Sequence, residues 1–318
     1  MIGLSAREAG DLVGRCAQLA SLLEVSAYPK PGNVHRTRDF PETRYEHFLA
    51  GGIALSPSMN LLAEKGYRVS EGRTTWDKVE LGEGVLSAID DSLRWQRGGN
   101  VNLGIALLFA PISSAAGFTL REFKVDPSEL REAVREAIQA STPEDAVAVY
   151  RAIRQSMTRR VLGRVDELDV GDESSIDKIR GEGITLIDVF RRSATRDAIS
   201  REWATGFEAT FTRGYPYLAQ GVGVKNPNTA IIDTFLHLLS EEPDSLIVRK
   251  SGLEAARKVS GVAGDIIKVG GLGSTRGRAM TEALDDELQR AGGALNPGTT
   301  ADLTASSLFV LLLTGWRP

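Results

Sequence analysis

The chain has 318 residues, enough to bury a large hydrophobic core, and its hydrophobic and charged fractions of 42% and 25% are typical of a globular protein. Its net charge of -4 provides no global field for nucleic acid, so any phosphate site must be local. The single cysteine excludes an internal disulfide framework. With no signal-peptide pattern and no apolar run near the roughly 20 residues of a membrane span, we expect a cytoplasmic protein without a membrane or nucleic-acid partner.

The N-terminal segment predicts a long helix. Ser5 and Glu8 have the spacing of a capping box, and apolar residues then recur with helical periodicity as far as Ala27. Pro29 and Pro31 follow, and proline does not continue a helix. The helix is therefore expected to end just before these prolines.

Polar residues gather where this helix ends. The flanking prolines hold the backbone around Lys30 extended, and Gly32 permits a tight turn or the close approach of a ligand. The polar side chains concentrated here are Glu24, Lys30, Asn33 and His35. The stretch is either a rigid helix terminator with exposed polar groups or part of a functional site.

The middle of the chain has mostly helical periodicity. The expected helices lie near 46–65, 81–93, 103–116, 128–140 and 143–156. The third of these is apolar on all sides, so it should be buried, and it follows Asn100 and Asn102. The acidic, glycine-containing stretch 162–185 is expected to be a long loop, either a solvated surface loop or a lid.

The C-terminal part also predicts helices. Aromatic residues at every fourth position indicate a helix over 196–212, and Asn228 or Thr229 caps the next helix. On that helix Asp233 and His237 lie one turn apart, and we expect a solvent-facing ion pair there, with metal ligation by the two residues as the less favoured alternative.

Two glycine-containing loops precede the last two expected helices. The first loop carries Arg276 at the start of a helix near 277–291, where free backbone N–H groups attract anions, although a flexible connection is an equal alternative. The second leads into an apolar helix over 303–313, with Asp302 near its positive N-terminal end.

No convincing run of alternating strand residues appears, and the connections are short. The sequence therefore predicts an all-α protein, a single globular domain over 1–318, with one or two buried central helices and a site formed by helix termini and loops.

The polar residues at these helix ends suit a bound magnesium polyphosphate. The candidate oxygen ligands are Glu24, Asp166, Asp233 and Asp302, and the candidate phosphate-binding cations are Lys30, Arg249, Lys250, Arg276 and Arg278. Mg²⁺ prefers carboxylates together with substrate phosphates, and arginine binds phosphate through two parallel hydrogen bonds. Zinc is disfavoured because the chain has few histidines and one cysteine.

Four segments occur in a recognisable order. They are Glu24 with Pro29–Gly32, Asn100–Gly104, Asp244–Lys250 and Asn296–Asp302. Together they resemble the triphosphoribosyl-dephospho-CoA synthase family over about residues 10–313. That family is all-helical, in agreement with the periodicity.

The resemblance implies a transferase that joins the ribose C1 of ATP to the 2′-hydroxyl of 3′-dephospho-CoA and expels adenine. The implied catalytic residues are Glu24, as base or metal ligand, Lys30 and His35. The implied phosphate and nucleotide contacts are Lys30, Asn100, Asn102, Arg249, Lys250 and Arg276. Mg²⁺ would be held by Asp302, Asp233 and Glu24.

Two segments depart from the family's usual sequences. They are Asn33–Phe40 and Asn100–Gly104, both where substrate contacts are expected. The alternatives are therefore a related Mg-ATP-dependent ribosyl transferase with another acceptor, simple nucleoside hydrolysis, or a non-catalytic nucleotide-binding protein. The sequence also leaves a homodimer open.

Overall fold

The computed structural model describes residues 4–157 and 168–318 of the chain, and the extended elements in these two ranges are helices, with only isolated bridges at His35–Arg38 and Arg121–Lys124. The helices are α1 (Ala6–Ser26), α2 (Tyr45–Ala54), α3 (Ser56–Ser70), η1 (Trp76–Lys78), α4 (Leu81–Trp95), α5 (Leu103–Thr119), α6 (Pro127–Gln139), α7 (Pro143–Ser156), α9 (Ser174–Glu182), α10 (Leu186–Ser193), α11 (Ala198–Thr205), η2 (Ala209–Gly214), α12 (Tyr215–Val222), α13 (Pro227–Glu241), α14 (Ser245–Ser251), α15 (Leu253–Lys268), η3 (Gly271–Gly273), α16 (Thr275–Arg290) and α17 (Gly298–Leu313). The predicted all-α fold is confirmed. None of the helices in the described ranges is long and apolar enough to cross a membrane.

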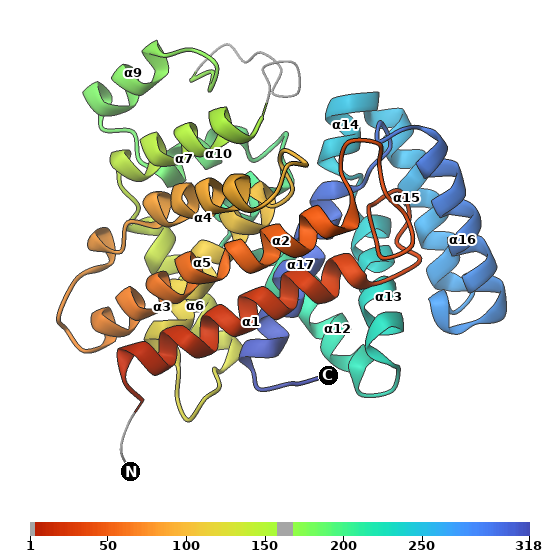
Figure 1. The fold of residues 1–318 in the computed structure, drawn as a ribbon, viewed down its shortest axis with the longest axis horizontal. Helices are drawn as coiled ribbons and strands as arrows, with labels where there is room; N and C mark the ends of the chain where they lie inside the picture. Colours follow the sequence, from red (N-terminus) through yellow and green to blue (C-terminus); the bar gives the residue numbers. More distant parts are fainter. Residues whose placement is uncertain (1–3, 158–167) are drawn as a thin grey trace.

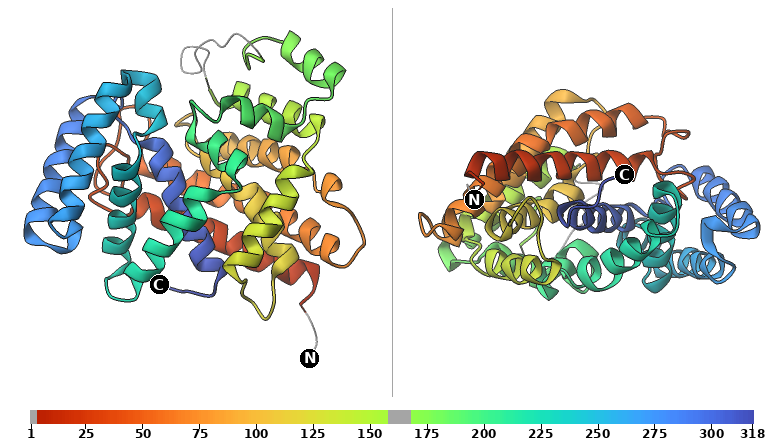
Figure 2. Two further views of the ribbon diagram at one scale, coloured as in Figure 1. Left: turned by 180° about the vertical axis from the view of Figure 1, so that it is seen from behind. Right: turned by 90° about the horizontal axis from the view of Figure 1, so that it is seen from below.

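Helices α1 and α17 connect two groups of helices. Helices α3 to α7 lie on one side of the molecule and α13 to α16 on the other, while α17 runs between α1 and the α12–α13 pair (Figure 1). Seen from below, α17 is enclosed by its neighbours (Figure 2). The N-terminal end of α17 therefore lies inside the molecule, where helices from both groups can reach it.

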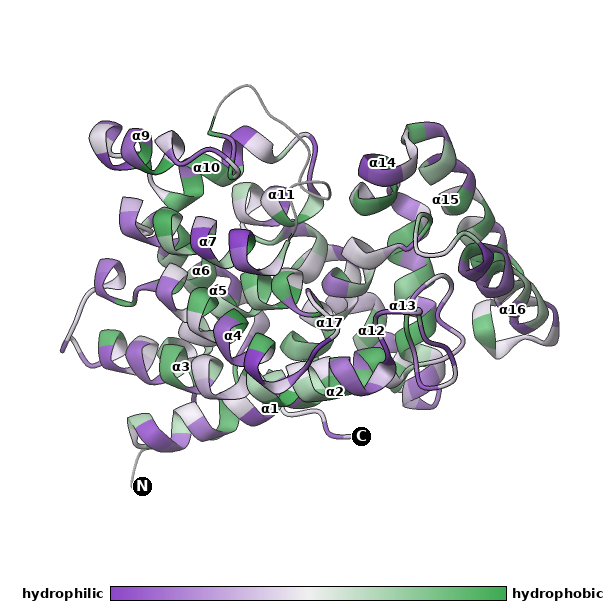
Figure 3. Cartoon of the chain, turned by 45° about the horizontal axis from the view of Figure 1, so that its top comes forward, coloured by the Kyte–Doolittle hydropathy of each residue, from purple (hydrophilic) through white to green (hydrophobic). Residues whose placement is uncertain are grey.

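The central position of α5 and α17 follows from their composition. Every residue of α5 except Gly104 and Phe118 is buried, and every residue of α17 except Gly298 and Asp302 is buried. A helix that is apolar on all sides is stable only inside a core. The outer helices instead alternate hydrophobic and hydrophilic faces (Figure 3). The prediction of one or two buried central helices is confirmed.

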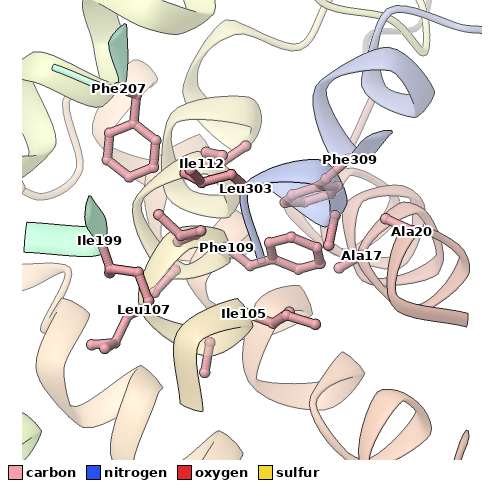
Figure 4. Close-up of a cluster of buried hydrophobic side chains, with 14 of the residues drawn as sticks. Ala17, Ala20, Ile105, Leu107, Phe109, Ile112, Ile199, Phe207, Leu303 and Phe309 are labelled. Atoms are coloured by element: carbon pink, nitrogen blue, oxygen red, sulfur yellow. The ribbon is translucent and has the colours of Figure 1, made fainter. Parts of the chain in front are cut away.

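The two central helices touch through aromatic rings. The centroids of Phe109 on α5 and Phe309 on α17 lie 4.5 Å apart, with the rings tilted by 34°. Ala17 and Ala20 of α1 lie beside Phe309 (Figure 4). Such pairs add to the area term of burial, so this contact fixes how α17 sits against α5.

Three segments differ from the expected boundaries. The helix expected over 46–65 is divided at Leu55 into α2 and α3, and the helix expected over 196–212 ends at Thr205, because Gly206 takes φ +65° and a π-helix follows. The stretch 162–185 is not one long loop, since it contains α9, which packs against α7 through the buried Ile179. Asp166 and the first part of that stretch lie outside the described residues.

Candidate functional site

The turn after α1 contains a buried ion pair. The chain leaves α1 at Ser26 and passes through a cis Tyr28–Pro29 peptide bond. Lys30 Nζ then donates a hydrogen bond to the Glu24 carbonyl oxygen at 3.0 Å and pairs with Glu24 Oε1. Both side chains are almost inaccessible to solvent. Burial raises the pKa of Glu24, and the Lys30 ammonium opposes that rise. The structure thus brings two predicted site residues together.

Helix α16 anchors this turn through a carboxylate that the sequence did not indicate. The Gly32 N–H donates to Asp285 Oδ1 at 3.0 Å, and His35 Nε2 lies 3.1 Å from Asp285 Oδ2. Gly32 takes φ +71°, and a Cβ there would lie 2.8 Å from Leu288. Thr37 Oγ1 lies 3.1 Å from the other ring nitrogen of His35. Because both of its nitrogens have partners, His35 is placed to hold the turn.

A second anchor fixes the opposite side of the turn. Asn228, at the start of α13, accepts a hydrogen bond from the Tyr28 N–H at 3.0 Å and donates one to the Tyr28 carbonyl at 2.8 Å. The position of Lys30 is therefore set jointly by α1, α13 and α16.

Several helix N-termini converge beside this turn. Asp244 caps α14 by accepting from the N–H groups of Leu246 and Ile247, at 2.8 and 3.1 Å. Its other oxygen accepts from the N–H and the hydroxyl of Thr300 in the first turn of α17, both at 2.7 Å. Ser245 accepts from the Ala198 N–H at the start of α11 at 3.2 Å. The positive ends of α11, α14 and α17 thus meet, and the Asp244 carboxylate is the anion that binds the N–H groups of α14 and α17 there.

Asp302 is only partly buried, in contrast to the fully buried residues that surround it in α17. Its side chain is partly accessible, and no residue in the described ranges makes a hydrogen bond or ion pair with its carboxylate. Its Oδ2 lies against the start of α5, where a Cβ on Gly104 would be only 2.0 Å away. The glycine at 104 therefore makes room for this carboxylate.

The charges around Asp302 are unbalanced. Burial and the negative charges of Glu24, Asp244 and Asp197 raise the pKa of Asp302 well above its ordinary value, while Lys30 opposes the rise. We call this group the carboxylate centre (Glu24, Lys30, Asp197, Asp244 and Asp302). An excess of negative charge over one ammonium favours either a proton or a cation.

The start of α5 places its two asparagines differently. Asn100 is exposed and accepts a hydrogen bond from the Leu103 N–H at 3.1 Å. Asn102 is buried, and neither its amide nitrogen nor its amide oxygen has a partner. A buried amide without partners is costly, so Asn102 is the member of the pair that calls for a ligand or a water.

The predicted cations lie at different distances from this centre. Arg249 and Lys250 occupy the last turn of α14, and Lys250 donates to the Gly293 carbonyl at 3.0 Å. Burial and the Arg249 charge lower the pKa of Lys250, and Asp244 opposes this. Arg276 is exposed in the first turn of α16, about 13 Å along the helix axis from Asp285. The structure does not bring Arg276 to the turn that α16 anchors.

Asp233 has structural partners of its own. It is buried and accepts hydrogen bonds from the Leu272 N–H and from Lys225 Nζ, both at 2.7 Å. The predicted solvent-facing pair with His237 is wrong, because η3 packs over Asp233, while His237 stacks on Tyr217 at 4.2 Å and pairs with Glu241 at 3.4 Å.

No group of three or more His, Cys, Asp or Glu side chains is arranged to hold a metal in the ranges 4–157 and 168–318. The predicted ligand set of Glu24, Asp233 and Asp302 is therefore not assembled as a protein-only site. A Mg²⁺ ion that takes most of its ligands from phosphates and water needs only one or two carboxylates. The unpartnered Asp302 fits that requirement.

Comparisons with known proteins agree with this architecture. A model of the ATP:dephospho-CoA triphosphoribosyl transferase family matches residues 11–318. Relatives named as probable 2-(5''-triphosphoribosyl)-3'-dephosphocoenzyme-A synthases include one from Streptococcus equi subsp. equi, 24% identical over 95% of this chain and 97% of the relative. Another, from Salmonella choleraesuis, is 26% identical over 96% of this chain and 92% of the relative.

A solved structure shares both fold and sequence with the chain. A crystal structure of a candidate triphosphoribosyl-dephospho-CoA synthase from Archaeoglobus fulgidus superimposes with a TM-score of 0.63 and 30% sequence identity, covering 86% of this chain and all of that one. The family match spans α1 through α17 and so includes every segment that forms the carboxylate centre. The chain belongs to the ATP:dephospho-CoA triphosphoribosyl transferase family, a family of transferases.

Proposed function

We propose that this chain transfers the triphosphoribosyl group of ATP to the 2′-hydroxyl of 3′-dephospho-CoA, with release of adenine. The observation that carries the proposal is the carboxylate centre, in which the buried Lys30–Glu24 pair lies within electrostatic reach of the unpartnered Asp302. Family membership supports the class of reaction. The acceptor is part of the proposal.

The chemistry makes clear demands on the site. The bond between the ribose C1 of ATP and adenine N9 breaks, and a bond from C1 to the acceptor oxygen forms. The acceptor hydroxyl loses a proton, and the departing adenine gains one. The sugar carbon becomes cationic in the transition state, as in glycoside hydrolysis. A site with excess negative charge stabilises such a carbon.

Glu24 is the proposed general base. Lys30 holds its Oε1, and no described residue donates a hydrogen bond to its second oxygen. Burial raises the pKa of Glu24, which makes its carboxylate a stronger base, while the Lys30 ammonium opposes the rise. Lys30 keeps the carboxylate oriented.

Asp302 is the proposed protein ligand for Mg²⁺ that arrives with the triphosphate. When bound, the ion would neutralise phosphate charge and fix the orientation of the nucleotide. Arg249, in the last turn of α14, has no hydrogen-bond or ion-pair partner in the described ranges, and it is the proposed contact for the triphosphate. Asn102 would contact adenine or ribose through its free amide.

The test is an adenine-release assay with Mg-ATP, run with and without dephospho-CoA and followed by mass spectrometry of the product. Acceptor-dependent adenine release and a product that joins the two substrates are expected. Glu24→Gln should lower kcat by about 100-fold or more, the usual contribution of a general base. The control Asp265→Asn, an exposed carboxylate on α15 paired with Lys268, should keep wild-type activity.

Two outcomes would replace this proposal. Adenine release that does not need dephospho-CoA would indicate hydrolysis or another acceptor. ATP binding without any adenine release would indicate a non-catalytic nucleotide-binding protein.

A further inference from the structure

An open hollow of about 380 Å³ lies where the loop after Lys30 meets the C-terminal end of α16. It is lined by Arg38, Asp39, Asp286, Gln289 and Arg290. None of these side chains has a role in the proposal above. The hollow lies on the outer side of the turn that holds Lys30, so its lining and the carboxylate centre share one short loop.

The lining offers free hydrogen-bonding groups. Arg290 uses Nε to donate to the Asp286 carbonyl at 2.9 Å, and its two terminal nitrogens have no partner in the described part of the chain. Gln289 donates from Nε2 to the Asn33 carbonyl at 2.7 Å, which leaves its amide oxygen free. Arg38 pairs with Asp286 and keeps a side chain that is 42% exposed.

The hollow is rigidly tied to the Lys30 turn. Asp285 accepts a hydrogen bond from the Gly32 N–H at 3.0 Å, and the same residue lies 3.6 Å from Arg38 Nε. The hollow and the turn therefore keep a fixed distance, which a site for a ligand that spans both would require.

We propose that this hollow binds the diphosphate and the adjoining end of the pantetheine arm of the acceptor, an inference that rests on the proposed function. A diphosphate diester carries two negative charges, and the free terminal nitrogens of Arg290 can donate to them, beside an Arg38 side chain that is 42% exposed but already paired with Asp286. The arm that follows carries a hydroxyl and amides, which match the free oxygens of Gln289 and Asp39.

The same lining argues against the triphosphate of ATP as the occupant. Two acidic side chains, Asp39 and Asp286, lie among the two guanidiniums, so the hollow has no excess positive charge. A lining without excess positive charge compensates the four charges of a triphosphate less completely than the two charges of a diester.

The test measures binding of dephospho-CoA by isothermal titration calorimetry to the full chain and to Arg290→Gln. The variant should bind dephospho-CoA about tenfold more weakly, as expected for loss of a charge-assisted contact, and should bind adenosine and ATP like the wild type. Arg290→Lys should recover part of the affinity. The matched control is Arg257→Gln, an exposed arginine on the neighbouring α15 and outside the hollow, which should leave every affinity unchanged.

Equal dephospho-CoA affinity in wild type and Arg290→Gln would overturn the inference, and so would a loss of affinity for ATP instead. The binding readout is independent of turnover. A wild-type chain that binds dephospho-CoA through Arg290 but releases no adenine would contradict the proposed function and leave the hollow assigned. Acceptor-dependent turnover with an unchanged KM for dephospho-CoA in Arg290→Gln would support the proposed function and contradict the assignment of the hollow.

Discussion

The turn after α1 and the N-terminal ends of α5 and α17 contrast in how far their polar groups are satisfied. In the turn, Lys30, His35 and Asp285 have their partners within the protein. At the helix ends, Asp302 and Asn102 have none in the described ranges. Satisfied polar groups stabilise a fold, whereas unsatisfied ones near charge mark the surface that a ligand completes. We therefore assign the first region to support and propose that the second region faces the substrate.

The largest expected effect separates these roles at Lys30. Lys30→Met leaves the buried Glu24 carboxylate without its ammonium, so the free energy of unfolding should fall by about 3–5 kcal/mol in urea denaturation. Lys30→Met combined with Glu24→Gln should recover most of that loss without recovering activity. If the single substitution leaves stability unchanged, the turn is not the support described here.

Asp302 should show the opposite behaviour. Asp302→Asn should lower adenine release by roughly 100-fold, or about 2.7 kcal/mol of barrier, while the protein becomes no less stable at neutral pH. The folded state raises the pKa of Asp302, so the wild type is favoured while this group is protonated and loses that advantage as pH rises through the folded pKa. Asp302→Asn has no titrating group at this position, so its stability does not fall over the same pH range.

Urea denaturation at several pH values measures this difference. Asp302→Asn should gain stability relative to wild type at pH 7–8, and the gain should shrink as the pH falls towards the unfolded pKa, because the folded wild type is then protonated at Asp302. A gain that is greatest in acid would contradict the assigned charge crowding.

Substitution of Asp285 tests the anchor of the turn and should lower the free energy of unfolding moderately. Asp285→Asn keeps the shape but weakens the bonds to Gly32 and His35, so unfolding should become easier by about 1–3 kcal/mol. Because Lys30 is positioned through this anchor, kcat should fall while the KM for ATP changes little. Chemical denaturation and steady-state kinetics on the same preparation give both numbers, and an unchanged kcat would restrict Asp285 to a structural role.

The smallest effect compares the two asparagines before α5. Asn100→Ala removes the acceptor for the Leu103 N–H and should cost about 1 kcal/mol of stability without affecting catalysis. Asn102→Ala removes no hydrogen bond, so its stability should stay within about 0.5 kcal/mol of wild type while the KM for ATP rises. Thermal unfolding should detect a loss of stability only in Asn100→Ala, and steady-state kinetics should detect a raised KM for ATP only in Asn102→Ala.

Local patterns predicted most of the fold. The capping box at Ser5 and the prolines after Ala27 define α1, and the all-round apolar residues of α5 and α17 predict their central position. The boundaries failed where one residue overrides periodicity, as at Gly206 with its positive φ. α9 was missed because its charged sequence carries little apolar signal and its helix is held by packing on α7.

The site was predicted only where its residues are close in sequence. Glu24 and Lys30 are six residues apart, and the structure brings them together. Asp285 contacts His35 across 250 residues, and no pattern around Asp285 signals that contact. Asp233 is bound by Lys225, in the loop before α13, and by Leu272, in η3. The sequence does not reveal that these two segments lie beside Asp233. Whether the predicted residues perform their assigned chemistry is what the variants above decide.

The double cap formed by Asp244 has a consequence for how this architecture can diversify. It ties the start of α14 to the start of α17, so the chain between them, α15 and α16, leaves and re-enters the core at two points held side by side. Insertions or exchanges in that excursion need not disturb the buried helices. Since α16 supplies Asp286, Gln289 and Arg290, the proposed acceptor hollow belongs to this excursion, and Asp285 is the residue through which a change there would reach the Lys30 turn.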